Sequence, residues 1–374
     1  MSVEGRRRWL ALYILCLGDL VIVLDSTIVN VALPSIREDL GFSETSLAWV
    51  VNAYLLTFGG FLLLGGRLGD LFGHRRMFLG GVTLFTLASV TCGLATSQGM
   101  LVAARAVQGL GGAVVSAVAL SLIMSLFTDA GERAKAMGVF GFVMAGGGSL
   151  GVMLGGILTD TLDWHWIFLV NVPIGVAVIL LSLRLVPVSR SAAVGGRLDV
   201  AGAVTVTAAL MLAVYAIVKG NDVGWTAART LGMLGLSAAL FVAFVVLESR
   251  VSAPLVPLRL FKLRNVATAN VAGVFWAAAM FAAFFVSALY LQLVLGYSPL
   301  QVGLVFLPSN VIMALFSLGL SAKLVMRYGI KRPLSSARVS AAFRAGMTTE
   351  TLAAAIYVAD QRRGGPNPAP PSST

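Results

Sequence analysis

Three ionisable side chains lie inside long apolar stretches of this sequence, where a charge is expensive to maintain. Asp19 and Asp25 fall within residues 9–33, and Arg105 falls within residues 100–126. A carboxyl group there can bind and release a proton, and an arginine at the same depth stabilises the carboxylate by pairing with it. We therefore interpret Asp25, Asp19 and Arg105 as candidate proton-coupling residues. The alternatives are a purely structural Asp25–arginine pair, a polar packing role for Asp19, and an Arg105 side chain that extends to the membrane surface.

The segments that must position these side chains are long and apolar. The chain has 374 residues, of which 58% are hydrophobic and 11% are charged, whereas a soluble domain has about 25% charged residues. The expected spans lie near 9–33, 47–65, 77–96, 100–126, 138–158, 166–186, 200–218, 230–248, 266–292 and 300–324. Because backbone polar groups in lipid must be satisfied within the segment, we predict an all-α integral membrane protein.

The net charge of +11 is distributed unevenly along the chain. Arginines and lysines concentrate at the N-terminus and in the loops at 67–76, 129–135, 184–199, 249–265 and 323–332. The alternate loops carry mostly acidic residues, so the pattern predicts a cytoplasmic N-terminus in a cell membrane and not a nucleic-acid-binding protein. Arg6, Arg7 and Arg8 precede the first apolar run, which we interpret as an uncleaved helix and not as a signal peptide.

Motifs for several other functions are missing from the sequence. A Gly-x-x-x-x-Gly-Lys-Ser/Thr phosphate loop and a Gly-x-Ser-x-Gly nucleophile motif are both absent. His74 and His165 are too far apart along the chain to suggest a metal site, and Cys16 and Cys92 lie in apolar runs, so we expect no disulfide between them. We therefore expect neither an enzyme nor a bound metal or cofactor.

A short loop of glycines and charges separates the second and third apolar segments. Residues 66–76 read Gly-Arg-Leu-Gly-Asp-Leu-Phe-Gly-His-Arg-Arg. The residues that we expect to form a conformational loop motif are Gly66, Gly69, Asp70, Gly73, Arg75 and Arg76. The glycines allow a tight turn, while Asp70 can cap the next helix or pair with arginines of neighbouring helices. The alternative is a basic loop that only sets topology.

Parts of this pattern recur near the end of the chain. The tripeptide Gly41-Phe42-Ser43 is echoed by Gly296-Tyr297-Ser298, and residues 67–76 are echoed by residues 323–332. Parallel repeats of six-helix halves are a feature of one large class of transporters. The repeat therefore predicts two related halves.

These motifs resemble those of the major facilitator superfamily, and in particular of its fourteen-span drug:proton antiporter family. The similar segments are 24–34, 66–76, 105–112, 146–156 and 163–175, in the family's order. The resemblance covers residues 9–332 and implies a transporter that exchanges protons for hydrophobic or cationic drugs. It also implies that Asp25 and Arg105 take part in proton coupling, with Asn30 as a polar contact near Asp25.

The resemblance assigns roles to two further groups of residues. Gly147, Gly151, Gly155 and Gly156 would form the antiporter motif of the fifth span, although this chain has Val152 where the family commonly has proline. That departure leaves passive helix packing as the alternative. The expected substrate contacts are Asn30, Trp49, Phe58 and Gln108, with core packing as the alternative for the aromatic residues.

The segments divide the chain into four parts. We predict a six-helix half at 1–187, a linker with two extra helices at 188–263, two helices of a second half at 264–332, and an atypical tail at 333–374. A frameshift would explain the abrupt change at Pro333, and a natural short variant is the alternative. The expected partners are protons, a small hydrophobic or cationic substrate and the lipid bilayer. The rival functions are a metabolite permease and a non-transporting remnant.

Overall fold

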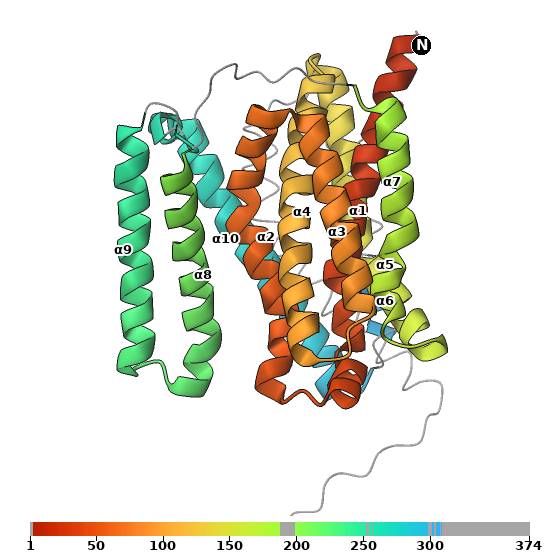
Figure 1. Cartoon of the computed structure of the whole chain (residues 1–374), viewed down its shortest axis with the longest axis vertical. Helices are drawn as coiled ribbons and strands as arrows, with labels where there is room; N and C mark the ends of the chain where they lie inside the picture. The colour runs from red at the N-terminus through yellow and green to blue at the C-terminus, as the bar shows by residue number, and fades with distance from the viewer. Residues whose placement is uncertain are drawn as a thin grey trace, which may run out of the picture.

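The structure is a computed structural model, and it describes residues 3–187, 199–251, 254–256, 258–297, 301, 302, 304–306 and 308. Every regular element among these residues is a helix (Figure 1). The first six are α1 (Val3–Leu40), α2 (Glu44–Phe72), α3 (His74–Gly93), α4 (Gln98–Leu126), α5 (Ala130–Thr161) and α6 (Trp166–Leu169). The rest are α7 (Asn171–Leu185), α8 (Val200–Val223), α9 (Ala228–Arg250), η1 (Leu258–Lys262), α10 (Arg264–Leu289) and η2 (Tyr290–Val294).

Eight spans in the described residues are long and apolar enough to cross a membrane. They correspond to the first eight predicted spans, and they make the chain a multi-pass membrane protein. The sixth, Trp166–Leu185, differs from prediction because it is broken at Val170 into α6 and α7. Helix α10 begins close to the predicted ninth span at 266–292. Most of the tenth span, the loop echo at 323–332 and the tail at 333–374 lie outside the described residues.

Helices α1 to α7 pack together as one group, which we call the six-helix unit because α6 and α7 form a single span (Figure 1). Helix α4 packs against both α2 and α3, and α1 packs against α5 and α7. Lipid tails are as apolar as these side chains, so close packing has to hold the helices together. Gly109 shows how close the packing is: a Cβ atom there would lie 2.3 Å from the Tyr54 carbonyl oxygen of α2.

The interior of the six-helix unit has two apolar layers. One includes Leu12, Phe78 and Phe127 near the N-terminal end of α1, and the other includes Ile36 and Leu101 near its C-terminal end. Fully buried polar side chains lie between the two layers. Their members are Asp25, Ser89, Arg105, Gln108 and Asn171, whereas the fully buried Asp19 lies on α1 between residues of the first layer.

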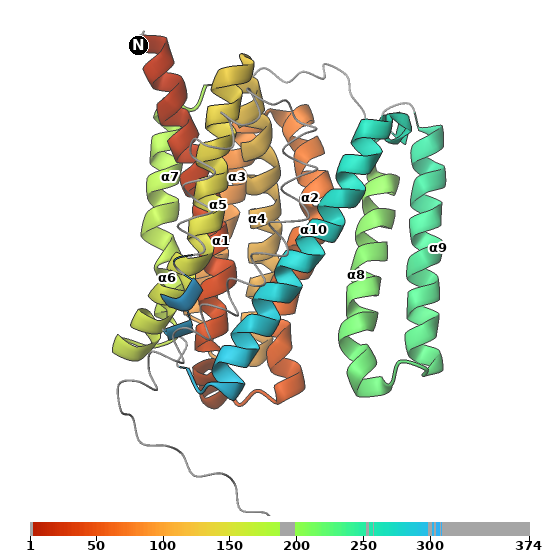
Figure 2. The same cartoon turned by 180° about the vertical axis from the view of Figure 1, so that it is seen from behind.

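Helices α8 and α9 form a hairpin beside the six-helix unit, and α10 crosses obliquely behind α2 and α8 (Figures 1 and 2). The hairpin contacts the unit through α2. The Thr207 hydroxyl donates to the Gly60 carbonyl at 2.9 Å, and the rings of Trp49 and Tyr215 lie 5.5 Å apart.

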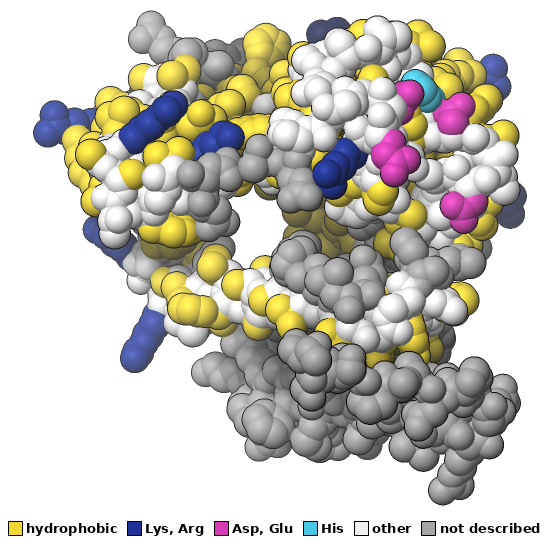
Figure 3. Space-filling model, turned by 90° about the horizontal axis from the view of Figure 1, so that it is seen from below, with side chains coloured by type: hydrophobic (Ala, Val, Ile, Leu, Met, Phe, Trp, Pro, Cys, Tyr) yellow, Lys and Arg dark blue, Asp and Glu magenta, His cyan; other side chains and the backbone are white. Residues whose placement is uncertain are grey.

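The two ends of the six-helix unit differ in charge. Exposed acidic side chains gather at the end remote from the N-terminus (Figure 3), including Glu38, Asp39, Asp160 and Asp163. The opposite end carries exposed arginines and lysines, including Arg6, Arg7, Arg76, Lys135 and Arg184. This is the asymmetry that the positive-inside rule associates with a cytoplasmic N-terminal end.

Candidate functional site

The carboxylate of Asp25 is the centre of a buried polar network. The Arg105 Nη1 donates to its Oδ2 atom, while Gln108 Nε2 and Asn171 Nδ2 each donate to Oδ1 at 2.8 Å. Asp25, Arg105 and Gln108 have no exposed surface, and Asn171 is 1% exposed. Both carboxylate oxygens thus accept hydrogen bonds from donors of α4 and α7, an arrangement that suits the ionised form.

The groups around Arg105 stabilise its buried positive charge. Its Nε donates to the Val50 carbonyl at 3.0 Å, and Nη1 also donates to Gln108 Oε1 at 2.7 Å. The guanidinium carbon lies 4.2 Å from the centre of the Tyr54 ring and 5.6 Å from that of Phe168. The negative faces of aromatic rings attract cations, so these rings help to replace the water that Arg105 has lost.

The local structure explains why these side chains meet. Arg105 and Gln108 lie three residues apart on α4 and therefore share one face of that helix. Gln108 also donates to Ser89 Oγ on α3 at 2.7 Å. Asn171 is the first residue of α7, next to the helix break at Val170. The network therefore joins α1, α3, α4 and α7, and the sequence-based expectation that Asp25 and Arg105 pair is confirmed.

Asp19 is not part of this network. Ser116 Oγ on α4 donates to Asp19 Oδ1 at 2.5 Å, and Asp19 has no exposed surface. Its Oδ2 has no hydrogen-bond partner among the described residues. Asp19 lies about 120° around α1 from Asp25, so the two acids form separate sites and Arg105 serves only one of them.

Comparison with known proteins identifies the family. Residues 15–349 match the family described as Major Facilitator Superfamily, which is most of the chain. The chain belongs to the major facilitator superfamily. The match extends past Pro333, where the composition changes.

Known relatives of this facilitator are named as exporters and resistance proteins. The chain is 43% identical to the cephamycin export protein CmcT of Amycolatopsis lactamdurans over 310 residues. This match covers 82% of this chain and 64% of that protein. The chain is also 40% identical over 345 residues to the puromycin resistance protein pur8 of Streptomyces alboniger, covering 92% and 68%. The chain thus spans about two thirds of the length of these relatives.

Solved structures support the fold. The proton:xylose symporter XylE superposes with a TM-score of 0.59 at 16% identity, covering 87% of this chain and 70% of that chain. The human organic anion transporter MFSD10 superposes with a TM-score of 0.53 at 17% identity, covering 87% of this chain and 74% of that chain. At such identities the likeness concerns the fold alone, and it agrees with the predicted all-α facilitator fold.

Residues 66–76 differ from the predicted loop, because α2 continues to Phe72 and α3 begins at His74, so the chain turns at Gly73 alone. Gly73 has a φ angle of +91°, which only glycine adopts readily. Asp70 Oδ2 lies 3.8 Å from Arg67 Nη1, and Asp70 Oδ1 lies 3.3 Å from His74 Nε2. The N-cap residue of α3 is Gly73, which makes no side-chain cap hydrogen bond, and a capping role for Asp70 stays a prediction.

The other members of the loop motif have different surroundings. Arg75 donates to the Leu183 carbonyl in the last turn of α7, whereas Arg76 is exposed. A Cβ atom on Gly69 would lie 2.9 Å from Val118 of α4, but one on Gly66 would meet only an ordinary contact. Gly69 and Gly73 thus have steric reasons to be glycine, and the conformational role of the whole motif stays a prediction.

Three glycines of α5 form a face against α1. Cβ atoms on Gly147, Gly151 and Gly155 would lie 3.0 Å or less from atoms of α1. Gly156 is the exception in the predicted motif, since nothing lies within 4 Å of a Cβ atom there. The spacing of four residues keeps the other three on one side of the helix, which allows the backbones of α1 and α5 to approach closely.

Gly151→Ala should therefore destabilise the protein, by about 1–3 kcal/mol as for other overpacked sites. The new Cβ atom would lie 2.9 Å from the Leu24 carbonyl oxygen and 2.0 Å from Thr27 Oγ1. The Thr27 hydroxyl is already held by carbonyls of α1, so it cannot move away freely. Thermal unfolding in detergent would measure the effect, with Gly156→Ala as the control. Equal midpoints for the two variants would contradict the tight α1–α5 contact.

The predicted substrate contacts lie in four different settings. Asn30 is exposed and donates to the Ser26 and Thr27 carbonyls of its own helix, so the expected polar contact with Asp25 is wrong. Trp49 packs on Tyr215 of α8, and Phe58 stacks near Tyr54 with their ring centres 6.0 Å apart. Gln108 is buried in the Asp25 network. Contact with substrate stays a prediction for all four.

Sequence reasoning missed three members of the site. Tyr54, Ser89 and Asn171 touch the charged pair or its partner Gln108, but each was an unremarked residue of an apolar run. Asn171 carried the clearest signal, because a buried amide within a span demands a hydrogen-bond partner. The sequence could not say which acid that partner was.

Proposed function

We propose that this protein is a proton-coupled exporter of small hydrophobic or cationic compounds, antibiotics among them. The observation that carries the proposal is the desolvated Asp25–Arg105 pair at the junction of four helices. Charged residues at such depth in a membrane protein are costly and mark proton or substrate pathways. The names of the relatives, which refer to antibiotic export and resistance, support the substrate class.

In the proposed mechanism, Asp25 takes up a proton from the outside. A proton on either oxygen removes an acceptor from Arg105, Gln108 or Asn171, which weakens the ties between α1 and the helices α4 and α7. The loosened unit favours one orientation of the transporter. Release of the proton toward the cytoplasm restores the ties while the substrate leaves. Asp19, with its own buried carboxyl group, is proposed as a second proton site.

The remaining parts of the proposal concern topology. We place the protein in the cell membrane with its N-terminus in the cytoplasm, supported by the basic residues at that end. Residues 1–187 would be the first half, 188–263 a linker with two extra helices, and residues from 264 onward part of a second half. Transport in this fold requires two halves that rock about a site between them.

Transport by inside-out membrane vesicles would test this function. Respiring vesicles become acidic inside, so a proton antiporter should accumulate ethidium, a hydrophobic cation, and lose it when nigericin collapses the pH gradient. Vesicles without the protein provide the baseline. Accumulation of a metabolite that ethidium does not compete with would favour a permease instead, and baseline uptake of every compound would favour a non-transporting chain.

A further inference from the structure

We propose that Asn171 is a positioning residue that links the protonation state of Asp25 to helix α7, and that α7 transmits this state to the turn between α2 and α3. The inference rests on the proposed function, because it takes Asp25 as the proton site. It adds a residue and a path that the proton-coupling pair alone does not contain.

One end of α7 is tied to the carboxylate. Asn171 is the first residue of the helix, and its Nδ2 donates to Asp25 Oδ1 at 2.8 Å. Val170, just before it, separates α7 from the short helix α6. A proton on Oδ1 would remove the acceptor that Asn171 uses.

The other end of α7 is tied to the loop motif. Arg75, at the start of α3, donates to the Leu183 carbonyl, and Arg7 of α1 donates to the Arg184 carbonyl at 3.1 Å. The last carbonyls of a helix lack partners within the helix and carry partial negative charge, so guanidinium groups stabilise them. Twelve residues separate Asn171 from Leu183, which corresponds to about 18 Å along the helix.

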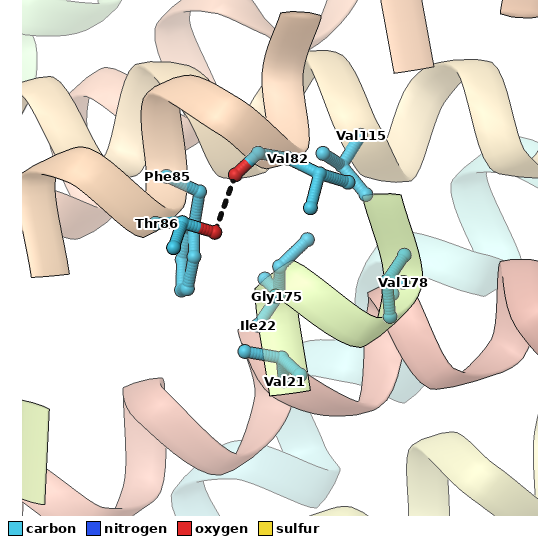
Figure 4. A pocket seen from close by; sticks show the side chains of 9 residues that line it. Val21, Ile22, Val82, Phe85, Thr86, Val115, Gly175 and Val178 are labelled. Carbon is cyan, nitrogen blue, oxygen red and sulfur yellow. Dashed lines mark hydrogen bonds between the residues drawn. The ribbon is translucent and has the colours of Figure 1, made fainter. Parts of the chain in front are cut away.

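The side of α7 that faces α1 and α3 borders a small apolar pocket (Figure 4). Gly175 and Val178 of α7 line it together with residues of α1, α3 and α4. Its cavity volume is about 10 Å³, far below the roughly 300–1,000 Å³ of ligand pockets. The pocket is therefore too small to be a ligand site.

Gly175, which lines this pocket, is a point where α7 contacts α3. A Cβ atom on it would lie 2.1 Å from Thr86 Oγ1, and the Thr86 hydroxyl is held by the Val82 carbonyl at 2.7 Å. Helix α7 thus rests on α3 through a residue without a side chain. The absence of a side chain at Gly175 lets α7 approach α3 closely at this point.

A pH response that comes from Asp25 must be distinguished from one that comes from other titratable groups near α7. Facing the network are Tyr54 of α2 and Cys92 of α3, together with Arg105 of α4 and Asp19 of α1. Asp70 of α2 and His74 of α3 lie near Arg75, which contacts α7, and His165 pairs with Asp163 before α6. A pH response that comes from these groups would survive neutralisation of Asp25.

The test measures how α7 moves with pH. Spin labels at Leu180→Cys on α7 and Met124→Cys on α4 would occupy exposed positions, while the native Cys16 and Cys92 are buried. Double electron–electron resonance on the protein in lipid nanodiscs gives the distance between the labels at acidic and alkaline pH. We expect a shift of about 1–2 Å, the size of helix shifts in other switching proteins.

Four variants in the labelled protein decide the outcome. Asn171→Leu and the smaller Asn171→Ser should both abolish the pH-dependent shift, and Asp25→Asn should abolish it as well. Asn270→Leu is the matched control, because Asn270 is exposed on α10 and donates to the Val266 carbonyl of its own helix. This control should keep the full shift.

Three results would contradict the inference, and each has a different meaning. A full shift in both Asn171 variants, with none in Asp25→Asn, would overturn the role of Asn171 and leave Asp25 as the proton site. A full shift in Asp25→Asn would overturn the inference and the proposed proton site together. The absence of any shift in the unsubstituted labelled protein would overturn the inference that α7 responds to protonation.

Discussion

Asp25→Asn should reduce proton-driven transport to the level of vesicles without the protein. Asparagine cannot take up and release a proton at physiological pH, so the pH gradient loses its proposed point of entry. The loss should be complete at every pH tested, because the substituted amide has no protonation state that mild acid or base can change. Ethidium accumulation in inside-out vesicles would be the measurement.

The same substitution should also destabilise the protein. Three donors converge on the Asp25 oxygens, and an asparagine amide would point its own NH₂ group at one or more of them. Removal of one partner of a buried ion pair costs about 3–5 kcal/mol. Size-exclusion chromatography and thermal unfolding would show whether the variant is folded before its transport is judged.

Asp160→Asn provides the matched control. Asp160 is exposed in the last turn of α5, so the same chemical change there should leave transport and stability unchanged. If a folded Asp25→Asn variant transported at the rate of the unsubstituted protein, the proposed mechanism would be wrong. Asp19 would then be the remaining buried acid in the described part of the six-helix unit.

Gly109→Ala should have the largest effect on stability among single methyl additions to α4. The new Cβ atom would lie 2.3 Å from both the Tyr54 carbonyl oxygen and Thr57 Oγ1. The carbonyl belongs to the backbone of α2 and cannot rotate away, so the two helices must separate. We expect a loss of about 3 kcal/mol, at the upper end of the usual range for overpacking.

The separation should also disturb the site. Gly109 follows Gln108, and Tyr54 lies beneath the Arg105 guanidinium, so a shift of α2 displaces groups around the charged pair. Gly99→Ala is the control, because it lies on the same helix with nothing within 4 Å of its Cβ atom. Thermal unfolding should leave that control unchanged. A Gly109→Ala variant as stable as Gly99→Ala would mean that α2 and α4 are not held this closely.

Hydropathy alone predicted the membrane spans well, because lipid imposes a length and an apolar composition on each helix. The charged pair was also predictable, since Asp25 and Arg105 are each too costly to bury alone. The break at Val170 does not show in the hydropathy, but Pro173 signals it: proline has no N–H to donate to the Leu169 carbonyl four residues earlier, and its ring crowds that carbonyl. Hydropathy measures the length of an apolar run and carries no information about its straightness.

The errors at individual side chains came from the angular position of residues on their helices. Asn30 follows Asp25 by five residues and lies about 140° away from it around α1, so the two cannot share partners. Gly156 follows Gly155 and is rotated by about 100° from the face against α1. Asn171 and Tyr54 could not be assigned at all, because their roles depend on which helices become neighbours in space.

The attachment of the α8–α9 hairpin has an evolutionary consequence. Its main described contacts with the six-helix unit are with α2, and they include one hydroxyl–carbonyl hydrogen bond and one ring pair. A pair of helices with so few contacts can be gained or lost without rebuilding the interior of the six-helix unit. Such a change would require only an insertion or deletion between α7 and α10 and a few matching residues on the outer face of α2.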